Sequence, residues 1–212
     1  MTRTALAALA VLSLASCRNI EGGPEVSQTR TLEPFTRVRI ESAIPAKLSP
    51  GKPQVTLNSQ EKVVANLLTE VKSGVLIVRL KPNVLVTSFD GTEVLITGEA
   101  VVAVEAIQGA NLKVTGIDVG PFRAAASGGS RLELIGGTAD ARFNASGGST
   151  IDADQLVAEI ASVDATGGSR LELHVTRSVE GSASGGSQVI VSGGGNAANV
   201  SASGGSLVSN AN

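Results

Sequence analysis

The sequence predicts an all-β fold: a right-handed parallel β-helix, or solenoid, built from coils of about 19 residues. The main observation is a pentapeptide, Ala-Ser-Gly-Gly-Ser with one threonine variant, that begins at Ala126, Ala145, Ala165, Ala183 and Ala202. Successive copies start 19, 20, 18 and 19 residues apart, and such a period is typical of solenoids in which each repeat is one coil. Apolar and polar residues alternate on both sides of each copy, as in strands with one buried face. Right-handedness follows from the strong preference of parallel crossovers for that hand.

The glycine pair in each copy predicts a tight corner between two strands. Residues without a Cβ adopt positive φ angles without strain and let backbones approach closely. Because stacked coils place equivalent residues on top of one another, a corner that needs glycine in one coil needs it in every coil. The predicted corner residues are Gly128 and Gly129, Gly147 and Gly148, Gly167 and Gly168, Gly185 and Gly186, and Gly204 and Gly205.

Composition argues against several classes of function. The formal net charge is −2, which argues against a nucleic-acid-binding protein. The chain has four Phe and no Trp or Tyr, so we do not expect a cleft that stacks sugars on aromatic rings. The core must instead come from Val, Leu, Ile and Ala in thin layers. The sole cysteine is Cys17, so disulfides play no role within the chain.

Residues 1–16 have the organisation of a signal peptide. Arg3 supplies positive charge, and the apolar stretch after it is too short for a membrane-spanning helix. Residues 14–17, Leu-Ala-Ser-Cys, resemble the bacterial lipobox, in which the cysteine is lipidated and becomes the mature N-terminus. The alternative is an ordinary cleaved signal with a chance cysteine. Arg18, rather than the Asp associated with inner-membrane retention, follows Cys17, so the sequence predicts an outer-membrane lipoprotein of the cell envelope.

The rest of the chain divides into three segments. Residues 17–30 are predicted to be the lipidated cysteine and a flexible polar tether. Residues 31–105 are predicted to form a less regular, β-rich cap, and residues 106–212 the regular solenoid, with both parts in one continuous domain over 31–212. A cap is expected because a bare terminal coil exposes its core and an open strand edge.

Three shorter patterns lie near or within the predicted cap. Residues 63–68 have the spacing of a short helix that begins after Asn58 or Ser59. Residues 70–80 have the pattern of a tight hairpin. Residues 107–111 lie about one period before Ser127, and Leu112 and Val114 follow them as in the later repeats, so they are predicted to belong to a degenerate first coil.

Together these features resemble a known bacterial family. The lipobox, the Phe-x-x-Val-x-Ile opening at Phe35–Ile40, the Gly-Val-Leu-Ile-Val segment at Gly74–Val78 and the repeated corners are similar to the bacterial head GIN domain family. Its members are described as putative auto-transporter adhesins and otherwise as a domain of unknown function. The resemblance covers about Phe35–Ser206, and the corner repeat is its most specific element. It implies a right-handed parallel β-helix and supplies no catalytic residues.

Three acidic residues share one position of the repeat: Glu133, Asp152 and Glu172. Stacked coils place them in a column of like charges, which is unfavourable unless cations compensate them. One interpretation is that calcium bridges the carboxylates, since Ca²⁺ takes several oxygen ligands. The other is that Arg131 and Arg170, two residues earlier on the same face, neutralise them. The arginine interpretation is favoured, because the sequence matches only half of the calcium-binding nonapeptide.

No catalytic centre is predicted. His174 is the only histidine, and it is expected on the solvated face of its strand without the other ligands that a structural zinc site needs. Asp152 and Asp154 share one strand face with nothing to bury them, whereas glycoside hydrolysis needs two acids across a cleft, one with a raised pKa. The sequence therefore predicts no catalytic residue, no metal and no cofactor.

The predicted function is that of a lipid-anchored envelope solenoid that serves as a non-catalytic adhesion, interaction or structural module. Its predicted partners are the membrane, through the lipid on Cys17, and an envelope protein or glycan. The alternative is a carbohydrate-active β-helix enzyme or a polysaccharide-binding protein. The last core layer, expected at Ala198, Val200, Ala202 and Leu207, is left uncovered. Weak end-to-end self-association, or burial of this end against a partner, is therefore also predicted. The alternative is a monomer whose open edge is satisfied by the side-chain amides of Asn196, Asn199, Asn210 and Asn212.

Overall fold

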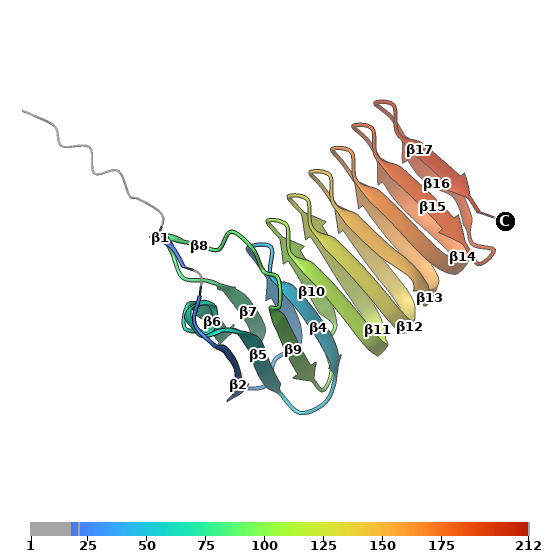
Figure 1. Ribbon diagram of the computed structural model, residues 1–212. Coiled ribbons are helices and arrows are strands. Elements are labelled where there is room, and N and C mark those ends of the chain that lie inside the picture. The colour runs from blue at the N-terminus through green and yellow to red at the C-terminus, as the bar shows by residue number, and fades with distance from the viewer. Residues whose placement is uncertain (1–17, 21, 212) are drawn as a thin grey trace, which may run out of the picture.

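The computed structural model describes residues 18–20 and 22–211. Four long strands form its regular part, and each makes most of one coil: β11 (Asn111–Ser127), β12 (Arg131–Ala145), β13 (Thr150–Ala165) and β14 (Arg170–Ala183). They pair with one another in parallel and stack side by side along the molecule (Figure 1). This arrangement confirms the predicted parallel β-solenoid.

Each long strand bends in its middle, so every coil contributes to two layers. In the first layer, the segments that follow the corners pair with β4 (Pro45–Pro50) at one end and with β15 (Gln188–Ser192) at the other, where β17 (Leu207–Asn210) follows. In the second layer, the segments that precede the corners pair with β10 (Ala103–Ile107) and β16 (Asn196–Ala202). The Gly-Gly corners connect the second layer to the first.

The hydrophobic core lies between the two layers. Alternate side chains along each strand are buried, as the sequence predicted: Phe122 and Ala124 are buried, whereas Arg123 between them is exposed. A single cluster of buried apolar residues extends from Phe35 to Val200. Since side chains on the other face of each layer point to solvent, residues at one repeat position form exposed columns that run along the molecule.

The N-terminal half extends both layers before it caps them. β3 (Arg37–Ile40) lies beside β10 in the second layer and β4 lies beside β11 in the first, so they form one more coil around residues 42–43. β7 (Val75–Leu80) and β9 (Glu93–Gly98) add the next parallel pair. The solenoid therefore begins at β3, well before residue 106. The sequence did not reveal this corner because its positive φ angles, 68° and 55°, belong to a serine and an alanine.

Antiparallel strands and one helical turn close the N-terminal end of the layers. β5 (Gln54–Gln60) extends the first layer beyond β9, and β6 (Leu67–Lys72) extends the second beyond β7. Between them, α1 (Glu61–Val64) buries Val63 and Val64 over the core. The predicted hairpin corresponds to β6 and β7. The predicted helix begins earlier and is shorter than expected. Its N-cap is Gln60, which forms no side-chain cap, and Asn58 and Ser59 both lie within β5.

The flexible tether predicted over residues 17–30 is wrong for its second half. β2 (Glu25–Thr31) pairs along its whole length with β5 and covers the edge of the first layer. Arg30 secures this strand: its Nη1 donates hydrogen bonds to the carbonyl oxygen of Leu67 at 3.0 Å and to Oγ1 of Thr69 at 2.9 Å. Most β2 side chains are exposed, so the strand has no apolar alternation by which the sequence could reveal it.

A short parallel pair joins β1 (Arg18–Asn19) to β8 (Val84–Leu85) at the same end of the molecule (Figure 1). Cys17 and the predicted signal peptide lie outside the described residues, so their roles stay predictions. Within residues 18–20 and 22–211, no helix has the length and apolar character needed to cross a membrane.

The core layer expected at the C-terminal end is wrong at three of its four positions. Val200 is buried as expected, but Ala202 is exposed. Ala198 is exposed and Ala197 is buried, because one extra residue in β16 shifts its register against β14. Leu207 is 55% exposed, whereas Val208 is half-buried and pairs with Val189.

Candidate functional site

The ten glycines predicted at corners all have positive φ angles, but the two members of each pair are not equivalent. The first glycine has φ between 58° and 66°, and a Cβ there would lie 3.0–3.4 Å from a backbone nitrogen of the preceding corner. The second glycine has φ between 73° and 77°, with no atom within 4 Å of such a Cβ. Close stacking of the corners therefore requires glycine at the first position. At the second position glycine is favoured only because the backbone has a positive φ angle.

The serine that ends each corner is also structural. Ser130, Ser149, Ser169 and Ser187 are buried, each 1% exposed. Each hydroxyl donates to the carbonyl oxygen three residues earlier, at 2.5–2.8 Å. The Ser187 hydroxyl also accepts a hydrogen bond from the backbone N–H of Ser169, on the neighbouring coil, at 3.3 Å. These hydroxyls satisfy corner backbone groups and are not a set of exposed nucleophiles.

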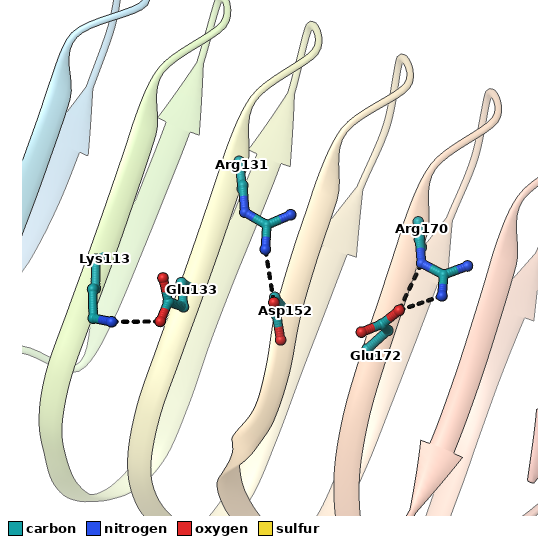
Figure 2. A network of polar contacts seen from close by, with 6 residues as sticks. All are labelled: Lys113, Arg131, Glu133, Asp152, Arg170 and Glu172. Atoms are coloured by element: carbon teal, nitrogen blue, oxygen red, sulfur yellow. Dashed lines mark hydrogen bonds and ion pairs between the residues drawn. The ribbon is translucent and has the colours of Figure 1, made fainter. Parts of the chain in front are cut away.

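The predicted acidic column lies on the outer face of the first layer, with one acid on each of three neighbouring coils (Figure 2). Lys113 Nζ lies 2.5 Å from Glu133 Oε1 on the next coil. Arg131 Nη2 likewise reaches the next coil and lies 2.8 Å from Asp152 Oδ2. Lys113 thus stands at the head of the column and Arg131 beside it, and these cations remove much of the repulsion between the like charges.

The third acid, Glu172, pairs within its own strand. Arg170, two residues earlier, donates to Glu172 Oε1 through two nitrogens (Figure 2). It also donates to Gln188 on the next coil. The arginine interpretation thus describes this column correctly, although it missed Lys113. The ion pairs occupy carboxylate oxygens that a calcium ion would need. In the part of the chain that the structure describes, no group of three or more His, Cys, Asp or Glu is placed to hold a metal ion.

Asp152 is the most constrained acid of the column. Its side chain is 21% exposed, and this burial raises the pKa of its carboxyl group. The negative charge of Asp154, two residues on along the same strand, raises that pKa further, while Arg131 opposes the shift. Asp154 itself is exposed. Asp152 and Asp154 lie on an open face, where the repulsion between their charges lowers the stability of the folded state.

His174 lies on the outer face, as predicted, and is half-buried. Its ring packs against Gly193 of the following coil, where a Cβ would come within 2.7 Å of Nε2. This contact gives the histidine a packing role.

A polar groove on the outer face of the second layer is the candidate binding site. It consists of two adjoining hollows of about 370 and 600 Å³, which share Arg142, Ser162 and Glu180. We call it the second-layer groove. The larger polar and charged residues that line it are Arg123, Asp140, Arg142, Asn144, Asp164, Glu180 and Asn199.

The groove follows one column of the repeat. Arg123, Arg142, Ser162, Glu180 and Asn199 are aligned on successive coils, each three residues before the last alanine of the strand. The sequence interpretation treated these residues only as the polar half of an alternating pattern and missed the groove. The comparison of repeat positions that found the acidic column would also have found the two arginines.

The profile of the family described as putative auto-transporter adhesin, head GIN domain, matches residues 34–195, which is more than half of the chain. The chain belongs to this family. The resemblance inferred from the corners and the opening segment is thereby confirmed. Among curated proteins, none matches this head GIN protein.

Solved structures share its fold. A putative adhesin from Bacteroides fragilis NCTC 9343 has a TM-score of 0.72 and 13% identity, with 90% of this chain and 98% of that chain covered. A putative lipid binding protein from Parabacteroides distasonis ATCC 8503 has a TM-score of 0.55 and 12% identity, covering 92% and 100%. A putative adhesin from Parabacteroides merdae ATCC 43184 has a TM-score of 0.53 and 14% identity, covering 92% and 99%. At these identities the likeness concerns the fold alone.

Proposed function

We propose that this head GIN protein is a lipid-anchored, non-catalytic adhesion or interaction module of the bacterial cell envelope, at the outer membrane. The family description supports a role in adhesion. The observation that carries the proposal is the second-layer groove, a polar surface that spans the coils from β11 to β16 and is open to solvent. An open groove across several coils suits the binding of an extended partner, such as an envelope glycan or a protein segment.

Anchoring through Cys17 gives this surface an orientation. β2 begins at Glu25, only eight residues after Cys17, and β1 and β2 both lie at the N-terminal end of the solenoid. A lipid on Cys17 would hold that end close to the bilayer. The coils from β11 onward then extend away from the bilayer, where a partner can reach the groove.

Replacement of Cys17 tests the anchor. Cys17→Ser is expected to release the protein from the membrane fraction, since a lipid on this residue supplies the membrane affinity in the proposal. Ser16→Ala, which keeps the cysteine, serves as the matched control and is expected to stay membrane-bound. If Cys17→Ser stays membrane-bound after an alkaline wash, lipid anchoring at this residue is wrong.

The non-catalytic role is supported by the exposure of the groove carboxylates. Asp140 and Glu180 both line the groove, and both side chains are exposed rather than enclosed. A glycoside hydrolase needs one carboxyl group held in its protonated form by its surroundings. The purified domain is expected to bind envelope fragments without releasing reducing ends from their polysaccharides. A release that disappears in Glu180→Gln would show instead that the groove is an active site.

A further inference from the structure

Two arginines on neighbouring coils give the second-layer groove its chemical character. Arg123 on β11 and Arg142 on β12 are aligned in the parallel ladder, so they lie on adjacent strands about 4.8 Å apart. Both side chains are exposed on the same face. Like charges directly opposite each other on a sheet destabilise it. The fold therefore keeps an unfavourable pair at this position.

The protein does not neutralise this pair as it neutralises the charges of the other layer. In the described part of the chain, the Arg123 side chain has no hydrogen bond or ion pair. Arg142 Nε donates one hydrogen bond, to Ser162 Oγ at 3.2 Å, and forms no ion pair. On the first layer, by contrast, Lys113, Arg131 and Arg170 each hold a carboxylate (Figure 2). Both guanidinium groups of the groove are thus available to an anion from outside.

The groove around the arginines offers hydrogen-bonding groups of both kinds. Asp140, Asp164 and Glu180 supply carboxylate acceptors, and none of them forms an ion pair in residues 18–20 and 22–211. Asn144 and Asn199 line the adjoining hollow and supply amide donors and acceptors. The hollows exist because the side chains between these larger groups, such as that of Ser162, are small. This set of groups suits a ligand that combines an anionic group with several hydroxyls.

We propose that the second-layer groove binds an acidic saccharide, a sugar chain that carries carboxylates. The carboxylate lies across Arg123 and Arg142, whose planar, forked donors match its two oxygens. Sugar hydroxyls bond to Glu180, Asn144 and Asn199. This inference rests on the proposed interaction function and adds the class of ligand and the residues that select it.

The three acids of the groove distinguish this ligand from a polyanion. Asp140, Asp164 and Glu180 repel a phosphate chain that runs along the whole groove, whereas a saccharide with spaced carboxylates can place hydroxyls beside them. The groove has no Trp or Tyr on which sugar rings could stack, because the chain contains neither. Binding therefore depends on the two arginines, and it weakens as ionic strength rises because both are exposed.

The test is a calorimetric titration of the chain without its predicted signal peptide and lipidated cysteine, residues 18–212, with oligogalacturonate as the acidic probe, dextran as the neutral probe and polyphosphate as the phosphate probe. We expect binding of oligogalacturonate alone, weakened by added salt. The double variant Arg123→Gln and Arg142→Gln is expected to lose at least about tenfold in affinity, or about 1.4 kcal/mol. The control Arg131→Gln removes one positive charge from the first layer and is expected to leave the affinity unchanged.

Thermal melting separates a lost contact from a lost fold. Because the substitutions remove repulsion between the arginines, the double variant is expected to melt at or above the temperature of the unaltered domain. Equal affinity in the double variant and the Arg131 control would overturn the proposal, as would binding of dextran with the same affinity. Stronger binding of polyphosphate would assign the arginines to phosphate instead. If oligogalacturonate fails but the domain still binds envelope fragments, the acidic-saccharide inference is wrong and the interaction function stands.

Discussion

The two glycines and the serine of each corner have different structural roles. The first glycine lets the backbone of one corner lie against the next, and the second lets the chain turn. The serine that follows satisfies the carbonyl group of the corner from inside the core. Three adjacent small residues thus solve three separate problems: stacking, conformation and hydrogen bonding. The pentapeptide recurs because each coil has to solve all three.

This division predicts different tolerances within one corner. Gly167→Ala is expected to destabilise the domain by roughly 2 kcal/mol or more, because it adds backbone strain and places a Cβ 3.2 Å from the backbone nitrogen of Gly147. Gly168→Asn is expected to cost less than about 1 kcal/mol, because asparagine tolerates positive φ and the space around residue 168 is open. Urea unfolding of the two variants measures the difference. Equal losses would show that close stacking of the corners does not matter.

Asp152 and Asp154 make one prediction about pH. The raised pKa of Asp152 means that the folded protein keeps a proton that the unfolded chain loses at about pH 3.9. Stability therefore falls as the pH rises from there to the folded-state pKa, and above it both carboxylates repel each other. Asp154→Asn removes that repulsion, so it is expected to stabilise the domain near neutral pH by less than about 1 kcal/mol.

A second measurement at low pH serves as the control for Asp154→Asn. At about pH 3, below the ordinary pKa of aspartate, the Asp152 carboxyl group with its raised pKa is neutral, so the difference between Asp154→Asn and the unaltered domain should disappear. Thermal melting at the two pH values measures this. A stabilisation that is the same at both would mean that it does not come from the charge of Asp154.

At the scale of elements, β2 is the strand that closes the first layer. It pairs with β5 through its backbone, and Arg30 links it to the end of α1 and the start of β6. The side chain of this arginine therefore ties the edge of the first layer to the edge of the second. Although its side chains are mostly polar, β2 is part of the folded domain.

Removal of that link should loosen the N-terminal end. Arg30→Ala is expected to cost about 1–3 kcal/mol, because it deletes charge-assisted hydrogen bonds to Thr69 and to the carbonyl oxygen of Leu67. Hydrogen exchange should become faster in β2 and β6 and stay unchanged in β13. Arg177→Ala is the matched control, since its ion pair with Glu159 is exposed and is expected to contribute less than about 0.5 kcal/mol. An Arg30 variant as stable as the control would contradict this role.

At the scale of the whole molecule, the two ends of the solenoid differ. Antiparallel strands and α1 cover the N-terminal end. At the other end, β16 and β17 have no further strand on their outer edges in the described part of the chain, and Leu207 is 55% exposed beside them. Open strand edges tend to pair with other chains. The predicted end-to-end association would use this surface.

The association is expected to be weak, because the core layer at this end consists of small side chains such as Ala197 and Val200. Sedimentation of the soluble domain over a wide range of concentrations is expected to show a growing dimer fraction. Leu207→Lys should abolish it by placing a charge on the exposed edge without disturbing the core. Thr150→Lys, a half-buried position on the outer face of β13, should leave it intact. A strict monomer at every concentration would rule out an associating end.

The sequence by itself determined the repeat. Corner glycines, alternating strands and the acidic column were all predictable, because a solenoid stacks equivalent residues and repeats each local requirement every coil. The family followed from the same features. Where the repeat is imperfect, prediction lost accuracy: the extra residue in β16 moved Ala198 outward, and a serine and an alanine formed the corner between β3 and β4.

Only the tertiary structure decided how the irregular half joins the solenoid and where the groove lies. The chain lays β3 and β4 between strands that come later in the sequence, and long-range pairings of this kind leave no local pattern. β2 is fixed by backbone hydrogen bonds, which any sequence can make, so its polar side chains were uninformative. The groove depends on which charges lack partners. The pattern of each strand predicts that its arginine, Arg123 or Arg142, is exposed. Only the stacking of the two coils shows that these arginines lie side by side without ion-pair partners.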